Sequence, residues 1–167
     1  NGGAGNDIII GAEGVDTAMF AGNFAEHDVS IDGDAVRVSS AHGETLLSGV
    51  EQLQFDDFTV KADGTNNAPV VQADSVAGNE DNALIISTAT LLANDIDVDG
   101  DTLTLSSVQE GVNGTVALNA LGDVVFTPDA DFNGTATFSY TVSDGQATST
   151  QTVSVMVSNV LPTAIDD

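Results

Sequence analysis

Residues 135–143 read T-A-T-F-S-Y-T-V-S, and this stretch decides how the second half of the chain folds. Its four apolar members, Ala136, Phe138, Tyr140 and Val142, alternate with hydroxyl side chains throughout. Successive side chains of an extended strand point to opposite faces, so this period of two places one face in a core and the other in water. The stretch therefore predicts one strand of a half-buried sheet.

Shorter patterns of the same kind lie on both sides of this stretch. They cover residues 70–76, 84–87, 102–105, 115–118, 124–127 and 152–157. Turn signals, such as Gly122-Asp123 and Asp144-Gly145, separate neighbouring runs. Residues 88–94 are the place where we expect a single helical turn. Short strands with turns about every dozen residues predict an all-β fold, with an antiparallel β-sandwich over residues 70–160.

Residues 94–101 read N-D-I-D-V-D-G-D and carry four carboxylates on alternate positions: Asp95, Asp97, Asp99 and Asp101. These charges repel one another unless a cation lies among them. The chain has only two lysine and arginine residues in total, so it offers almost no basic partner. Ca²⁺ prefers clustered carboxylate and carbonyl oxygens. The run therefore predicts a calcium site, and the alternative is a solvated acidic loop.

The whole chain is strongly acidic, with a net charge of −24 over 167 residues. This charge excludes nucleic acid as a partner and disfavours an anionic membrane surface. No stretch has the apolar length of a membrane helix, so membrane insertion is not expected. Hydrophobic residues still make up 41% of the chain, which predicts a folded protein that needs counter-ions. There is no cysteine, so bound metal would replace disulfides as the staple of a secreted protein.

Two nine-residue repeats open the chain. Residues 2–10 (G-G-A-G-N-D-I-I-I) fit the calcium-binding pattern G-G-x-G-x-D-x-U-x, in which U is a large apolar residue. Residues 11–19 (G-A-E-G-V-D-T-A-M) follow in register but depart from the pattern at Ala12 and Ala18. Glycines allow turns with positive φ that bring carbonyls inward, and the aspartate adds a carboxylate. The candidate calcium ligands of this block are Gly2, Gly5, Asp7, Gly11, Gly14 and Asp16.

This block resembles the RTX family of secreted calcium-binding proteins. The resemblance implies a β-roll in which calcium lies between turns stacked on one side, so two consecutive copies complete no site by themselves. We therefore do not expect full occupancy at Asp7 and Asp16. Apolar–polar runs at residues 25–31, 35–39 and 47–60, with a hairpin signal at Asp32-Gly33, predict strands that cap the open roll. Residues 1–62 are interpreted as the end of a β-roll with capping strands.

Residues 63–69 (D-G-T-N-N-A-P) have the composition of a linker. Pro162 follows Pro69 after 93 residues, and a similar short sequence follows each proline. We interpret residues 70–160 as one complete repeat and residues 161–167 as the start of the next. A period near 100 residues suits a string of sandwich domains.

Residues 63–160 resemble the cadherin-like repeats of large bacterial surface proteins. The linker fits the cadherin pattern D-x-N-D-N-A-P, with Thr65 and Asn66 as departures. The resemblance implies calcium ligands from the linker, from a glutamate after the first strand, from a D-x-D pair, and from a late aspartate before glycine. The D-x-D pair is either residues 97 and 99 or residues 95 and 97. We expect these groups to meet at one end of the sandwich; they are Asp63, Asn66, Asn67, Glu80, Asp95, Asp97, Asp99, Asp101 and Asp144.

The acidic run also fits the start of an EF-hand calcium-binding loop, which begins D-x-D-x-D-G. The position of the last EF-hand ligand holds Ser106 instead of glutamate, and the flanking residues have strand patterns. We therefore reject the EF-hand.

These patterns predict a non-enzymatic, calcium-rigidified segment of a large secreted or cell-surface protein, such as an adhesin or a biofilm matrix protein. The resemblance implies export by type I secretion and folding outside the cell. The expected partners are calcium, neighbouring tandem repeats, and cell-surface or matrix ligands.

Two other functions are weighed against this one. The chain could be an accessory RTX module of a secreted hydrolase or peroxidase, but it contains no Gly-x-Ser-x-Gly or zinc motif. His27 and His42 have no acid or nucleophile at motif spacing, so no catalytic residue is predicted. A carbohydrate-binding sandwich would need exposed aromatic platforms, and the chain has no Trp and one Tyr, which has a core position.

Overall fold

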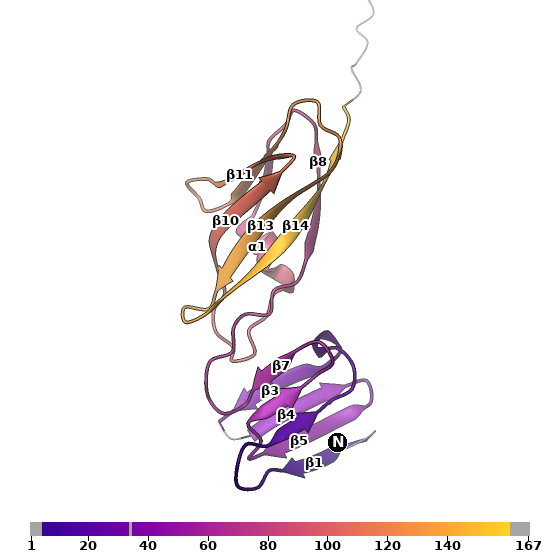
Figure 1. Ribbon diagram of the computed structural model, residues 1–167, viewed down its shortest axis with the longest axis vertical. Coiled ribbons are helices and arrows are strands. Elements are labelled where there is room, and N and C mark those ends of the chain that lie inside the picture. The colour runs from indigo at the N-terminus through magenta and orange to yellow at the C-terminus, as the bar shows by residue number, and fades with distance from the viewer. Residues whose placement is uncertain (1–4, 34, 161–167) are drawn as a thin grey trace, which may run out of the picture. The chain divides into compact units, whose positions relative to one another are not determined.

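The computed structural model describes residues 5–33 and 35–160, which form two compact units (Figure 1). Unit 1 contains Asn1–Asn67 together with Asp97–Asp101, and unit 2 contains Ala68–Ile96 and Thr102–Asp167. Almost all regular structure is strand, so the predicted all-β class is confirmed. Gly2 and the proposed start of the next repeat at residues 161–167 lie outside the described residues.

Unit 1 is built from two sheets. The first has the order β1-β5-β4-β3, and the second has the order β2-β6-β7. A short 3₁₀ turn, η1 (Phe24–Glu26), precedes β3. The strands are β1 (Asp7–Ile10), β2 (Thr17–Met19), β3 (Asp28–Asp32), β4 (Ala35–Ser40), β5 (Gly43–Ser48), β6 (Gln52–Gln54) and β7 (Thr59–Lys61). The two nonapeptides therefore enter different sheets, because β1 pairs in parallel with β5 and β2 pairs in parallel with β6.

The local sequence explains this arrangement. In the nonapeptides, the positions marked U point inward: Ile9 is half-buried and Ala18 is buried, whereas Ile8 and Ile10 are exposed. The predicted hairpin after Asp32 is confirmed by the antiparallel β3–β4 pair. Gly11 is required by close approach, since a Cβ there would lie 1.5 Å from the carbonyl oxygen of Gly49. The buried hydrophobic residues of the unit are Ala18, Phe24, Val36, Val38, Leu47, Val50, Leu53, Phe55, Val60, Ala62 and, from the acidic loop, Val98.

Unit 2 is a sandwich of a four-stranded sheet, β10-β13-β14-β8, and a three-stranded sheet, β11-β12-β9 (Figure 1). Its strands are β8 (Asp74–Asn79), β9 (Leu84–Ile86), β10 (Thr104–Val112), β11 (Gly114–Leu118), β12 (Val124–Pro128), β13 (Gly134–Ser143) and β14 (Thr148–Ser158). The predicted helical turn is present as α1 (Thr88–Leu91) followed by η2 (Leu92–Asn94), and the Ser87 hydroxyl caps it by accepting from the Thr90 amide. The predicted sandwich is confirmed.

The core of unit 2 follows the alternation along β13. Ala136, Phe138, Tyr140 and Val142 are buried against valines of β14, and Phe138 stacks on Phe126 of the opposite sheet at 5.8 Å between ring centroids. The sandwich is not wholly antiparallel, because β8 pairs in parallel with β14. Apolar alternation reports which face of a strand is buried and carries no information on strand direction, so this pair could not be predicted.

Candidate functional site

Asn67 attaches the linker to the acidic loop Asp97–Asp101 within unit 1. Its side chain is 4% exposed and bridges the backbone of Lys61, accepting from the amide at 2.7 Å and donating to the carbonyl at 2.9 Å. Asp99 receives two further hydrogen bonds, from the Asn67 amide nitrogen at 2.6 Å and from Nδ2 at 3.0 Å. In this arrangement the side chain of Asn67 holds the linker against the acidic loop, and its oxygen accepts a hydrogen bond from the Lys61 amide.

The acidic loop folds around Asp97. One carboxylate oxygen, Oδ1, accepts from the backbone amides of Asp99 and Asp101, and Gly100 turns the chain with φ +80°. The other oxygen, Oδ2, is buried and has no hydrogen-bond partner among the described residues. Burial raises the pKa of Asp97, while the two amide hydrogen bonds act in the opposite direction. The loop thus leaves one desolvated acceptor oxygen without a donor.

Asp63, at the start of the linker, is held by Thr65. Its Oδ1 accepts from both the amide and the hydroxyl of Thr65, and these bonds lower the pKa of the Asp63 carboxyl. Lys61 Nζ donates to the carbonyl of Asn66 at 3.2 Å. Thr65, a departure from the cadherin pattern, therefore orients the acid that begins that pattern.

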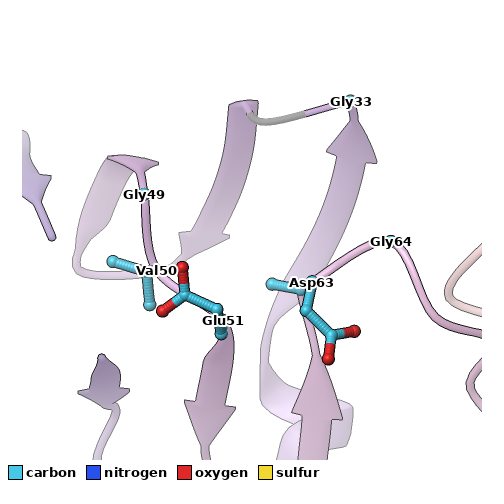
Figure 2. Close-up of a pocket in the computed structure, with 7 residues that line it drawn as sticks. Gly33, Gly49, Val50, Glu51, Asp63 and Gly64 are labelled. Carbon is cyan, nitrogen blue, oxygen red and sulfur yellow. The ribbon is translucent and has the colours of Figure 1, made fainter. Parts of the chain in front are cut away.

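Asp63 also lines a cavity of about 260 Å³ with Glu51, Val50, Ala62 and three glycines. Figure 2 shows Glu51 and Asp63 on neighbouring segments, with their carboxylates turned away from each other. Glu51 is already engaged, because its Oε2 accepts from the Asp16 amide at 2.8 Å. The cavity therefore does not gather the two acids around a common point.

Asp95 belongs to unit 2 and faces the sandwich core. It is 8% exposed, accepts from the Gln72 amide at 2.9 Å, and lies 3.2 Å from the Tyr140 hydroxyl. The same hydroxyl lies 2.9 Å from Asp74, so one proton serves two carboxylates. Burial raises the pKa of Asp95, and burial with these acids also raises the pKa of Tyr140. Sequence reasoning missed this buried cluster, although a single Tyr among valine strands was its signal.

Glu80 and Asp144 lie at opposite ends of unit 2. Glu80 follows β8, where its amide donates to Ser158 and its Oε1 accepts from Val160. Asp144 lies in the turn before β14, and its Oδ1 accepts from two amides of that turn. The eleven residues of β14 separate the two acids by about 35 Å. The expectation that both join one site is wrong, because the parallel β8 strand carries Glu80 away from the Asp144 turn.

The nonapeptide acids are used differently from each other. Asp16 closes its own turn by accepting from the Ala12 amide at 2.7 Å. Asp7 has one buried carboxylate oxygen without a hydrogen-bond partner among the described residues. Gly5 and Gly14 adopt positive φ, as the pattern requires. Within residues 5–33 and 35–160, no group of three or more His, Cys, Asp or Glu side chains is arranged to hold a metal ion.

A family model for the cadherin-like domain matches residues 65–158. The chain belongs to the cadherin-like domain family. The match covers the whole sandwich, including the Asn67 contact with Asp99, the Asp95–Tyr140 cluster and all seven strands of unit 2. Cadherin-like domains are typically extracellular and commonly bind calcium. In the described part of the chain, no helix has the length and apolar character that crossing a bilayer requires.

Solved structures resemble the chain only weakly. An endo-fucoidan hydrolase of glycoside hydrolase family 107 has 19% identity over 76% of this chain and 18% of that chain, with a TM-score of 0.42. Drosophila N-cadherin EC1-3 has 12% identity over 87% of this chain and 65% of that chain, with a TM-score of 0.37. The chain thus spans less than a fifth of that hydrolase. No curated protein has a significant match to the sequence.

Proposed function

We propose that this chain is a non-enzymatic, calcium-binding structural or adhesive segment of a secreted or cell-surface protein. The observation that carries the proposal is the desolvated Oδ2 of Asp97, which has no hydrogen-bond donor among the described residues. A buried carboxylate oxygen without a partner is costly, and a hard cation removes that cost. Membership of a family whose domains commonly bind calcium supports the same ion.

The ligands would come from the acidic loop and the linker. Asp97, Asp99 and Asp101 supply carboxylates on one short loop, and Asp63 and the Asn66 carbonyl supply further oxygens from the linker. Asn67 holds the two segments together through Asp99. Calcium prefers six to eight oxygen ligands. Water would fill the remaining positions, and small movements of these side chains would bring their oxygens to the ion.

Calcium would change the electrostatics of this region. Two carboxylates about 6 Å apart repel by roughly 3 kcal/mol at an effective dielectric of 20. Several such pairs are comparable with the whole stability of a domain, on the order of 5–15 kcal/mol. A bound divalent ion turns this repulsion into attraction, and we propose that it stiffens the linker at residues 63–69 between a first domain at 1–62 and a sandwich at 70–160.

The first domain is proposed to be the end of an RTX β-roll. Its support is that both nonapeptides form parallel edge strands, each with its U position directed inward. An RTX block would place the parent protein among those exported by type I secretion. Neighbouring repeats and cell-surface or matrix ligands are the partners of such a segment.

Calcium titration by calorimetry tests the proposal on the intact chain. We expect heat of binding and a higher melting temperature in calcium than in chelator, and both are lost in the double variant Asp97→Asn, Asp99→Asn. Asp129→Asn, an exposed loop acid, is the matched control and should behave like the wild type. Binding that is unchanged in the double variant would show that the acidic loop is only solvated.

A further inference from the structure

The four-stranded sheet of unit 2 is almost free of charge. Among the 6, 9, 10 and 11 residues of β8, β10, β13 and β14, only Asp74 and Glu110 are charged. Asp74 turns inward to Tyr140, and Glu110 lies in a bulge of β10 at positive φ. Charged residues are about one in six along the whole chain, so these strands carry far fewer than their share.

The outer face of this sheet is covered by hydroxyl groups in register. The paired rows place the following residues on it: Thr104, Ser107, Gln109, Thr135, Thr137, Ser139, Thr141, Ser143, Thr148, Thr150, Thr152, Ser154 and Ser75. Several are joined to one another: Thr141 lies 2.9 Å from the Thr150 hydroxyl and accepts from Gln109 at 3.0 Å. β-Branched side chains have little rotamer freedom to lose, so this face is already ordered for binding.

Two apolar side chains stand at one end of the same face. Val112 is 54% exposed and pairs with Thr137, and Met156 is 56% exposed and pairs with Thr135 in the neighbouring row. Scattered exposed apolar residues are ordinary on protein surfaces. Here, however, both lie on one nearly uncharged face, where Glu110 in the β10 bulge is the nearest strand charge and where they offer apolar contact beside hydroxyl groups.

We infer that this face docks against the same face of a second copy of the chain. Two chains of net charge −24 repel through any surface that carries acids. An uncharged face escapes that repulsion at close range. A basic partner would instead favour the acidic loops, so the neutral face favours an equally uncharged surface with matching hydrogen-bond donors and acceptors, which the same face of a second copy supplies.

The size of the face predicts a weak contact. Strands about 4.8 Å apart with a rise of about 3.3 Å per residue give this face an area of roughly 600 Å². Two such faces would bury about 1,200 Å², which is the lower limit of stable interfaces and typical of transient ones. Lateral contacts of this strength would become effective when many copies are aligned, because linked sites bind with high avidity.

The opposite face of the sandwich is the natural control. Its strands β9, β11 and β12 are also uncharged, but its outward row is short: Ile85, Val125 and Ala117. Thr127 is exposed at the centre of that sheet, on β12, as Thr152 is exposed at the centre of the four-stranded face, on β14. The same substitution can therefore be made on each face in a comparable setting.

Sedimentation equilibrium from 5 µM to 1 mM tests the contact, in calcium and in chelator. We expect reversible dimers whose dissociation constant falls several-fold between 0.1 M and 1 M NaCl, because screening lengths drop from about 10 Å to about 3 Å. Thr152→Asp should weaken the dimer at least tenfold, and Thr127→Asp should leave it unchanged. A strictly monomeric chain at 1 mM, or equal loss in both variants, would overturn the inference.

Single cysteines give a second readout, because the chain has none of its own. A two-fold contact brings the centres of the two faces together, so Thr152→Cys should form disulfide dimers faster than Thr127→Cys. Equal rates would contradict the contact.

A neutral dextran tests a different occupant. If it binds the wild type but not Thr152→Asp, while the chain stays monomeric, the face binds polysaccharide and the inference is overturned. Dimers that persist in chelator would support this contact even if the calcium proposal failed, because they form without the ion.

Discussion

The two units reach their folds by different means. Unit 2 has strands of up to eleven residues around fully buried Phe126, Phe138 and Tyr140. Unit 1 has strands of three to six residues and depends on close backbone contacts such as that between Gly11 and Gly49. It also contains the acidic loop, with its unpartnered buried oxygen among the described residues. Both units have an apolar core, but only unit 1 combines its core with short strands and the acidic loop, whose charges repel without counter-ions, so calcium and chelator should act mainly on unit 1.

The largest effect should come from the sandwich core. Phe138→Ala removes a buried ring that stacks on Phe126, and large-to-small changes of this kind cost about 3–5 kcal/mol. We expect amides of unit 2 to lose protection in hydrogen exchange by that amount, equally in calcium and in chelator. Val112→Ala, at an exposed position, is the control and should change stability by less than about 0.5 kcal/mol. If the loss of exchange protection in Phe138→Ala were larger in chelator than in calcium, unit 2 would also depend on calcium, and the proposed difference between the units would not hold.

A backbone approach should give the next largest effect, this time in unit 1. Gly11→Ala places a methyl group within 1.5 Å of the Gly49 carbonyl oxygen, which forces the two segments apart. Overpacking of this kind typically costs about 1–3 kcal/mol. Exchange protection should fall in β1 and β5 and stay constant in β13 and β14. Ala12→Gly, at the exposed neighbouring position, serves as the control; similar losses in both variants would mean that the contact is not specific.

The attachment of the acidic loop should contribute a comparable amount. Asn67→Ala leaves the amide and carbonyl of Lys61 without their side-chain partner and removes one of the two hydrogen bonds to Asp99, which keeps the bond from the Asn67 backbone amide. An unsatisfied buried polar group costs about 1–3 kcal/mol. Calorimetry should also show weaker calcium binding, because Asp99 is then held by one hydrogen bond instead of two. Asn133→Ala, an exposed asparagine in unit 2, should match the wild type in both measurements. Unchanged calcium affinity in Asn67→Ala would show that the Asn67 side-chain contacts are not needed for the metal site.

The sandwich fold could be predicted from the sequence, but the grouping of the candidate ligands could not. Alternation along residues 135–143 identifies a buried face because burial depends only on period, and Phe138 and Tyr140 are indeed in the core. Ligand grouping depends on strand direction as well, and the parallel β8–β14 pair moved Glu80 to the far end from Asp144. The acids Asp95 and Asp97 show the same limit. They have alternate positions in one acidic run, whereas in the structure Asp95 hydrogen-bonds with Tyr140 and Asp97 accepts from the amides of its own loop.

The smallest effect, and the one that separates these two acids, is the pH dependence of Asp95. Burial raises its pKa in the folded state above the ordinary value of about 3.9. Between those two values the folded protein binds more protons than the unfolded chain, so this contribution to stability is present at low pH and is lost as pH rises. Asp95→Asn removes the charge and supplies donors to a cluster in which one hydroxyl proton serves two carboxylates.

The variant should therefore be more stable than the wild type at pH 7, by on the order of 1 kcal/mol, and the difference should shrink as pH falls towards 4. Chemical unfolding in chelator at several pH values measures it, with Asp129→Asn as a control whose difference from the wild type stays flat. If the difference for Asp95→Asn is also flat, the carboxyl is solvated in the folded state. Asp95 would then be available to the same ions as Asp97, and the division between a core acid and a loop acid would not hold.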